Sequence, residues 1–215
     1  MFTGLITDVG ELVSITAAGN GVSMVVRTAY DLSKVAEGAS IACDGVCLTA
    51  ETFGTGTFTI TAGQETLDKT TLGSWTPGRR MHLEQATRVG DHLGGHLVQG
   101  HVDGVGTIRS VEVRQESWIF WVEPSEELAR YIVTKGSITL DGVSLTVNEL
   151  DSTDAFRLNI IPHTVKNTHV DTWCPGAKVN LEVDVLARYV ERLLTWRPGG
   201  GLTLERLAEL GYGRN

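Results

Sequence analysis

Apolar and polar residues alternate with a period of two along much of the chain. Every second residue is apolar in the runs 22–26, 58–62, 156–160 and 179–183. Successive side chains of a strand point to opposite faces, so each run predicts a strand with one buried face. The pairs Asp44-Gly45 and Asp141-Gly142 separate β-prone runs and predict tight hairpins. Short strands at this spacing predict closed or nearly closed antiparallel barrels, because closure removes exposed sheet edges.

Helical patterns interrupt the strands. Residues 125–133 follow Pro124, with Ser125 as the N-cap candidate, and residues 30–36 are the expected equivalent in the first half. From Val185 to Leu194, apolar residues recur at helical spacing opposite arginines. This helix has no counterpart in the first half. Its apolar face must be buried either by self-association or by packing against the protein's own barrels, and self-association is the preferred interpretation. A second, shorter helix is expected over residues 203–210.

The chain repeats itself in three blocks. Residues 40–49, SIACDGVCLT, return 97 positions later as SITLDGVSLT at 137–146. A block with Thr66 and Glu84 returns 98 positions later, and Gly4 returns 96 positions later as Gly100. One duplicated module explains this order, with domains expected at 1–97 and 98–184, a linker within 88–95, and a helix with a tail at 185–215. Any pocket in one half therefore has a counterpart in the other.

Composition excludes some classes of function. The net charge of −8 argues against nucleic acid as a partner, since nucleic-acid binders usually carry basic patches, and it is otherwise typical of ordinary solubility. Three cysteines match no zinc or disulfide pattern, and free thiols are typical of a reducing compartment. The first residues resemble neither a signal peptide nor a membrane anchor, so a cytoplasmic protein without membrane contact is expected. His96 and His101, predicted on opposite faces of a strand, do not suggest a metal site.

Polar differences between the copies indicate a division of labour, which general acid–base chemistry requires. Three aligned pairs differ: Leu5 with His101, Cys47 with Ser144, and Ala86 with Asp184. Each polar member also has a purely structural alternative. His101 is then a satisfied strand histidine and Cys47 a small buried residue. Ser144 then satisfies a turn, and Asp184 is the N-cap of the terminal helix.

The start MFTG, the run GGHLVQGHV at 94–102 and DGVSLT at 141–146 resemble the riboflavin synthase family of the alpha-chain type. The resemblance covers residues 1 to about 195. It implies an all-β fold of two tandem six-stranded Greek-key barrels plus a C-terminal amphipathic helix that assembles a homotrimer. It also implies active sites between the first barrel of one subunit and the second barrel of its neighbour, and it suggests lumazine synthase as a partner protein.

The activity implied by the resemblance is a dismutation without cofactor or metal. Two molecules of 6,7-dimethyl-8-ribityllumazine bind per active site, and one transfers a four-carbon unit to the other. The products are riboflavin and 5-amino-6-(D-ribitylamino)uracil. Two copies of one pocket suit a reaction that consumes two copies of one substrate.

The resemblance also assigns residues. It gives catalytic roles to Cys47, His101, Ser144 and Asp184. First-barrel substrate contacts are expected at Gly4, Leu5, Ile6, Ser40, Leu48, Thr49, Thr61, Ala62, Gly63, Gln64, Glu65 and Thr66. Second-barrel contacts are expected at Gly100, Val102, Lys135, Leu145, Thr146, Asn159, Ile160, Ile161, Pro162, His163 and Thr164. His163 stands where the family often has an acidic residue.

A non-catalytic lumazine-binding paralogue is the main alternative. Such a relative is expected to degrade one pocket and hold one ligand per chain, whereas the enzyme holds two. Both Asp-Gly-Val hairpins survive here, as do Thr49, Thr146 and His101, which favours the enzyme. A flavin or NAD reductase barrel would need a nucleotide-binding domain that this sequence lacks.

Overall fold

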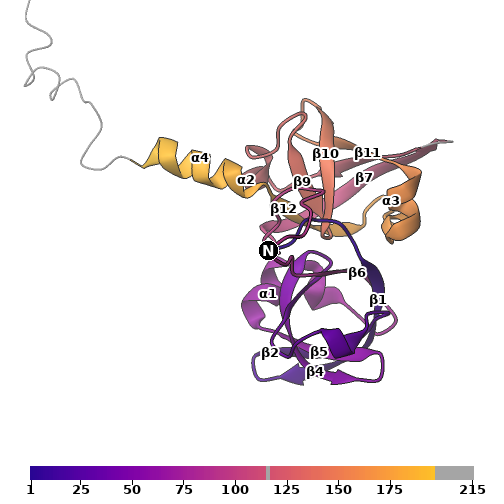
Figure 1. Ribbon diagram of the computed structural model, residues 1–215. Helices are drawn as coiled ribbons and strands as arrows, with labels where there is room; N and C mark the ends of the chain where they lie inside the picture. The colour runs from indigo at the N-terminus through magenta and orange to yellow at the C-terminus, as the bar shows by residue number, and fades with distance from the viewer. Residues whose placement is uncertain (115–116, 197–215) are drawn as a thin grey trace, which may run out of the picture. The chain divides into compact units, whose positions relative to one another are not determined.

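The computed structural model describes residues 1–114 and 117–196. Within these ranges the strands form two closed, antiparallel, six-stranded barrels (Figure 1). The first barrel has the spatial order β1-β2-β5-β4-β3-β6. Its strands are β1 (Asp8–Ala18), β2 (Gly21–Arg27), β3 (Ser40–Cys43), β4 (Val46–Gly54), β5 (Thr57–Ala62) and β6 (Arg80–Gln85).

The second barrel repeats this order as β7-β8-β11-β10-β9-β12. Its strands are β7 (Gly104–Arg114), β8 (Ser117–Glu123), β9 (Ser137–Leu140), β10 (Val143–Leu150), β11 (Phe156–Ile160) and β12 (Lys178–Val183). In each barrel the second strand pairs with the fifth rather than the third, which is a Greek-key connection. The predicted all-β fold of two tandem barrels is confirmed.

Both predicted hairpins are present, and their tips touch. Asp44 and Gly45 have φ angles of 43° and 79°, and the equivalent Asp141 and Gly142 have 42° and 84°. Two successive positive φ angles define the type I′ turn that an Asp-Gly pair favours. A Cβ atom on Gly45 would lie 2.7 Å from the backbone nitrogen of Gly142. Only glycine therefore allows the two turns to approach this closely.

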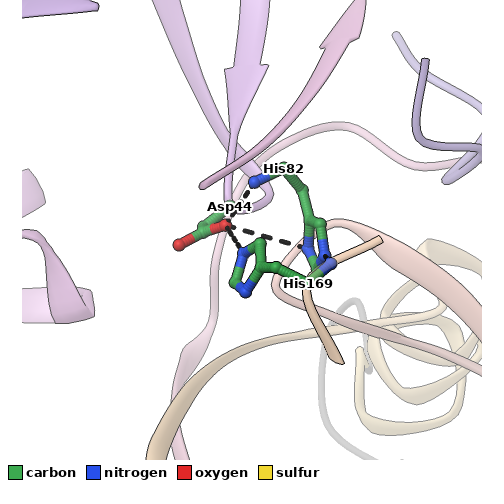
Figure 2. Close-up of side chains that lie close together, drawn as sticks. All are labelled: Asp44, His82 and His169. Atoms are coloured by element: carbon green, nitrogen blue, oxygen red, sulfur yellow. Dashed lines mark hydrogen bonds and ion pairs between the residues drawn. The ribbon is translucent and has the colours of Figure 1, made fainter. Parts of the chain in front are cut away.

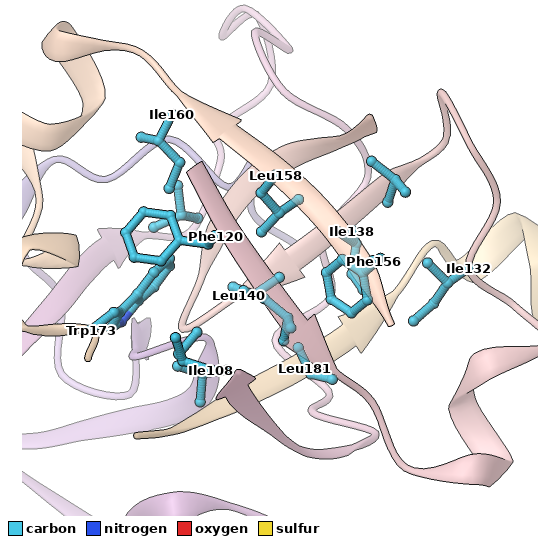
Figure 3. Close-up of a cluster of buried hydrophobic side chains, with 14 of the residues drawn as sticks. Ile108, Phe120, Ile132, Ile138, Leu140, Phe156, Leu158, Ile160, Trp173 and Leu181 are labelled. Atoms are coloured by element: carbon cyan, nitrogen blue, oxygen red, sulfur yellow. The ribbon is translucent and has the colours of Figure 1, made fainter. Parts of the chain in front are cut away.

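Each barrel interior is filled by the inward residues of its alternating strands. Figure 3 shows the second core, where Phe120 packs edge-on against Trp173 with ring centroids 5.5 Å apart. Phe156 and Leu158, from the predicted alternating run on β11, are fully buried there. The first core is built the same way around Phe58 and Ile60. The apolar residues at every second position thus form the one face of each strand that packs into the barrel interior.

The short helices differ from the sequence-based expectation. The predicted helix over 125–133 is reduced to α2 (Glu126–Ala129), and Ser125 at its N-cap position makes no side-chain cap hydrogen bond. Its expected equivalent over 30–36 is only a 3-10 turn, η1 (Leu32–Lys34). The other short helices are α1 (Gln64–Lys69), η2 (Thr71–Ser74), α3 (Pro162–Asn167) and η3 (Val170–Thr172). The segments α1 and α3 follow the fifth strand of their barrels.

Helix α4 (Val185–Thr195) confirms the predicted terminal helix. From Leu186 onward it belongs to a separate compact unit. Its large apolar side chains are exposed by 55% to 75%, and they are Leu186, Tyr189, Val190, Leu193 and Leu194. The shorter helix expected over 203–210 lies outside the described residues. No helix among the described residues is long and apolar enough to span a bilayer.

Candidate active site

Two short segments, which we call straps, connect the barrels. The first strap is residues 2–6 and the second is residues 98–102. Each precedes one barrel but hydrogen-bonds to the other: the backbone N–H of Ser144 donates to the Gly4 carbonyl at 2.8 Å, and that of Cys47 donates to the Gly100 carbonyl at 2.9 Å. The straps also meet each other in an antiparallel bridge between Phe2 and Val98.

This exchange differs from the sequence-based assignment for part of each strap. Gly4, Leu5 and Ile6 were expected in the first pocket, and Gly100, His101 and Val102 in the second. Instead, Ile6 packs against the second core and Val102 against the first. His101 consequently lies with Cys47, and the first strap lies with Ser144. Alignment of the repeats identified equivalent residues correctly but not the barrel that each one contacts.

A buried carboxylate anchors each strap to the barrel that follows it. Glu84 on β6 accepts hydrogen bonds from the backbone N–H groups of Thr3 at 2.7 Å and Gly4 at 3.0 Å. Its counterpart Glu182 on β12 accepts them from Gln99 at 2.6 Å and Gly100 at 2.9 Å. Burial raises the pKa of Glu182 to about 7, although the donated hydrogen bonds oppose the shift.

Glycine is required where each strap crosses the other barrel. Gly4 and Gly100 have φ angles of 75° and 77°, in the left-handed region. A Cβ on Gly4 would lie 2.5 Å from the Cβ of Ser144, and one on Gly100 would lie 2.6 Å from the Cβ of Cys47. Each glycine thereby brings the strap backbone against the residue expected to be catalytic.

The outer faces of the hairpin strands carry the polar candidates. On β3 and β4, Ser40 pairs with Thr49 and Ala42 with Cys47. On β9 and β10 the equivalent pairs are Ser137 with Thr146 and Thr139 with Ser144. Three residues expected to contact substrate instead bury their side chains in the barrel cores, so only their backbones remain available: Leu48, Ala62 and Ile160. Leu145 is half-buried and packs against the second core.

One cleft brings six of the candidates together, three from the first barrel and three from the second strap. It has a volume of about 260 Å³ and lies between β4, helix α1 and the second strap. Cys47 and His101 both line it, and Lys69 adds a cation that the sequence did not single out. The complete lining is Val46, Cys47, Glu65, Thr66, Lys69, Thr70, Gly100, His101 and Val102.

The remaining candidates are distributed more widely. Ser40 lines a cleft of about 190 Å³ beside η1, and Leu5 lines another of about 390 Å³ with Thr7 and Tyr30. Gly63 is the N-cap residue of α1 and Ile161 that of α3, and the two helices carry Gln64 to Thr66 and Pro162 to Thr164. Many of the candidates are exposed: Leu5, Thr49, Thr61, Gly63, Gln64, Glu65, His101, Lys135, Thr146, Asn159, Ile161, Pro162 and His163.

Ser144 has a histidine partner that sequence reasoning missed. His96 Nδ1 lies 2.7 Å from Ser144 Oγ, and its Nε2 lies 3.2 Å from Thr139 Oγ1. Burial lowers the pKa of His96, while the negative charge of Asp184 opposes the shift. His96 was expected on a strand opposite His101, but residues 94–103 form no strand apart from the bridge at Val98. His96 lies within the GGHLVQGHV motif at 94–102, which could have identified it as a site residue.

A buried polar cluster links the two barrels (Figure 2). Asp44 Oδ1 accepts from the backbone N–H of His82 at 2.7 Å and from His169 Nε2–H at 2.9 Å. Arg79 donates to Asp44 Oδ2 at 2.9 Å. His82 donates through Nδ1 to the Asp141 carbonyl at 2.8 Å and accepts at Nε2 from the backbone N–H of His169 at 2.9 Å. These bonds fix the neutral Nδ1–H tautomer of His82.

The cluster has a defined distribution of charge. Burial would raise the pKa of Asp44, but hydrogen bonding from His169 and nearby positive charge lower it to about 2. Burial lowers the pKa of His82 to about 3. Burial also opposes charging of His169, yet its bond to Asp44 raises the pKa of that imidazole. A charged Asp44 thus lies beside neutral His82, and its hydrogen bond favours the charged form of His169.

The same three residues are close enough to be considered as metal ligands. Their donor atoms are, however, already committed: the Nε2 lone pair of His82 accepts a backbone hydrogen, and Asp44 Oδ1 accepts two hydrogen bonds. We therefore interpret the cluster as a polar link between barrels. Sequence reasoning missed it because Asp44 was explained by its turn and the three residues are far apart in the chain.

Comparisons with known proteins agree with this architecture. The lumazine binding domain family matches residues 3–86 and again residues 99–184. A riboflavin synthase of Actinobacillus pleuropneumoniae is 38% identical over 99% of this chain and 100% of its own length. A riboflavin synthase of Brucella abortus is 42% identical over 92% of this chain and 100% of its own length.

Similar solved structures support the fold. The crystal structure of LumP complexed with riboflavin has a TM-score of 0.79 and 22% identity, covering 85% of this chain and 99% of LumP. At that identity the likeness concerns the fold alone, whereas the riboflavin synthases match at higher identity over almost the whole chain. The chain therefore belongs to the riboflavin synthase family, built from two lumazine binding domains.

Proposed function

We propose that this chain is a riboflavin synthase that converts two molecules of 6,7-dimethyl-8-ribityllumazine into riboflavin and 5-amino-6-(D-ribitylamino)uracil. The observation that carries the proposal is the match to curated riboflavin synthases over 99% and 92% of the chain, with both lumazine binding domains intact. The duplicated barrels fit a reaction in which one compound plays two roles.

The residues at the two sites suit such a dismutation. The methyl group on C7 of the lumazine ring is acidic, and its anion attacks a second ring that acts as the electrophile. Holding two rings in reactive orientation supplies much of the acceleration. Polar groups then transfer protons, and we propose Cys47 with His101 at one site and Ser144 with His96 at the other, because each pair shares a cleft or a hydrogen bond. No cofactor or metal is required by this scheme.

The active enzyme is proposed to be a homotrimer with each active site shared between subunits. The first barrel of one subunit would face the second barrel of its neighbour, so that two bound lumazines meet. Support comes from α4, whose apolar residues are exposed by 55% to 75%, an arrangement that a subunit interface would cover. A cytoplasmic location accords with three free cysteines. Association with lumazine synthase stays a prediction from the family resemblance.

The test is an assay of the purified protein with 6,7-dimethyl-8-ribityllumazine in the presence of a metal chelator. The enzyme is expected to develop riboflavin fluorescence, with two substrate molecules consumed for each riboflavin formed. Substrate that binds and remains unchanged would identify a non-catalytic lumazine-binding protein, the alternative raised by the fold likeness to LumP.

A further inference from the structure

The two candidate catalytic residues have chemically opposite surroundings. Cys47 pairs across its hairpin with Ala42, and it packs with Ala86 against a buried apolar cluster that includes Phe2. Ser144 pairs across its hairpin with the hydroxyl residue Thr139. The apolar Ala86 is replaced in the second copy by Asp184. The Cys47 thiol thus lies among apolar side chains, whereas the equivalent Ser144 hydroxyl lies beside groups that can form hydrogen bonds.

His96 completes the polar side of this comparison. It is 9% exposed, and both of its ring nitrogens are engaged, Nδ1 with Ser144 Oγ at 2.7 Å and Nε2 with Thr139 Oγ1 at 3.2 Å. A neutral imidazole carries hydrogen on one nitrogen only, so a Ser144 hydroxyl that donates to Nδ1 leaves Nε2–H to donate to Thr139. The three side chains then form a directed chain of hydrogen bonds.

The backbone around Ser144 is shaped to admit this contact. A Cβ on Gly95, the residue before His96, would lie 2.9 Å from Ser144 Oγ. Gly4 also approaches Ser144 closely, as described above. Ser144 is half-buried, so its hydroxyl is held beside Gly4 of the first strap and the Gly95-His96 segment without being sealed in the core. His101, by contrast, is an exposed side chain at the rim of the first cleft.

We propose that His96 is a positioning residue that makes Ser144 the proton-exchanging group of the second site, with Thr139 fixing the orientation of the imidazole. This inference rests on the proposed riboflavin synthase activity. When the Ser144 oxygen takes a proton from bound lumazine, its own hydroxyl hydrogen passes to Nδ1 of His96. The ligand loses one proton and the imidazole gains one, and the proton returns to a later intermediate by the same path.

Two features suit His96 to this role. Its lowered pKa keeps the ring neutral near pH 7, so that Nδ1 is free to accept a proton. Asp184 is the charged group that acts on His96, and its negative charge stabilises the imidazolium while it lasts. In the first site the positions equivalent to Thr139 and Asp184 are Ala42 and Ala86, so the polar groups that act on His96 in the second site have no counterpart beside Cys47. The structure therefore assigns relayed proton transfer to one of the two sites.

The test is a double-mutant cycle with His96→Gln and Ser144→Ala, in which kcat is measured from pH 5 to 9 and binding of an unreactive lumazine analogue by fluorescence titration. His96→Gln is expected to lower kcat about a hundredfold with little change in Kd, since glutamine cannot shuttle the proton. The double variant should be no slower than Ser144→Ala, because the two groups act as one unit. The decline of wild-type kcat at acid pH, where His96 becomes protonated, should be absent from His96→Gln.

Thr139→Val removes only the orienting hydroxyl and provides a second variant if His96→Gln folds poorly. We expect about a fivefold loss of kcat, the value of one hydrogen bond. Additive effects in the cycle, weakened binding with unchanged kcat, or an unaltered pH profile would each overturn the relay. If the wild-type protein makes no riboflavin, the proposed function is wrong and the relay that rests on it is wrong as well. If the wild type is active and His96→Gln equals it, only the relay fails.

Discussion

His82 and Asn180 occupy equivalent positions on β6 and β12 and make the same two hydrogen bonds. His82 accepts from the backbone N–H of His169 and donates to the Asp141 carbonyl. Asn180 accepts from the backbone N–H of Thr71 at 2.8 Å and donates to the Asp44 carbonyl at 2.9 Å. An imidazole and an amide thus perform one task in the two copies, tying each barrel to the hairpin turn of the other.

This equivalence predicts how substitutions of His82 rank. Asparagine can reproduce both hydrogen bonds, so His82→Asn should lose mainly the stacking of His82 on His169, about 1 kcal/mol. His82→Ala leaves a buried N–H and a buried carbonyl unpaired and should cost about 3 kcal/mol. Urea unfolding at pH 7 measures both. Equal losses for the two variants would show that shape, not hydrogen bonding, determines the contribution of His82.

The pH dependence of stability should change in His82→Asn. The folded-state pKa of His82 is about 3, below the value of about 6.5 in an unfolded chain. Its stabilising contribution is therefore complete above pH 6.5 and is lost as the pH falls toward 3. Asparagine does not titrate, so between pH 7 and pH 5 the wild type should lose about 2 kcal/mol more than the variant.

His169 provides the internal check on that experiment. Its folded-state pKa is raised, so its contribution is complete at acid pH and is lost as the pH rises through that pKa. This second effect is common to the wild type and His82→Asn and should cancel in their difference. Urea titrations of both proteins at pH 5, 6 and 7 give the comparison. A difference in unfolding free energy that does not vary with pH would contradict the neutral state of His82.

The strap glycines make a separate prediction about the active site. Gly100→Ala combines a positive φ with a steric clash against Cys47, and it should destabilise the protein by about 3 kcal/mol and abolish most activity. Gly78→Ala is the matched control, because Gly78 has φ of 90° but nothing within 4 Å of its Cβ position. It should cost about 1 kcal/mol and leave kcat unchanged. Thermal unfolding and the riboflavin assay of both variants then separate the backbone strain, which both variants share, from the steric clash, which only Gly100→Ala has.

The sequence predicted the barrels well because their determinants are local. Alternation set the buried face of strands such as β5 and β11, and two Asp-Gly pairs set the hairpins. The exchange of straps is not local. Gly4 and Gly100 align with each other in the repeat, but their hydrogen bonds to Ser144 and Cys47 cross between barrels. An alignment of two copies says which residues correspond and contains nothing about which barrel each one touches.

Two site residues were missed for the same reason, because their contacts are not local in the sequence. His96 was read as part of a strand, although the segment leaves regular structure to reach Ser144. Asp44 had a sufficient explanation as a turn residue, so its bonds to His82 and His169 were not anticipated. Local patterns also overestimated the helix at 125–133, where only four residues are helical, because tertiary packing decides the length of such short elements.

The exposed face of α4 predicts how the chain assembles. Leu193 and Leu194 are 73% and 75% exposed, so glutamate at both positions should not disturb the barrels but should prevent a helix-mediated trimer. Arg192→Ala, an exposed neighbour on the same helix, is the control and should remain trimeric. Sedimentation velocity reports the oligomeric state, and circular dichroism reports the fold. A double glutamate variant that stays trimeric would place the assembly surface elsewhere.

Shared active sites predict complementation between two inactive variants. Cys47→Ala with His101→Ala disables the first site of a chain, and Ser144→Ala with His96→Gln disables the second. If each active site combines the first barrel of one subunit with the second barrel of its neighbour, unfolding and refolding an equal mixture should restore about a quarter of the sites, since each partner is intact half the time. Each variant refolded alone should stay inactive. A mixture no more active than its components would show that both pockets of a working site belong to one chain, and the trimer would then have no part in catalysis.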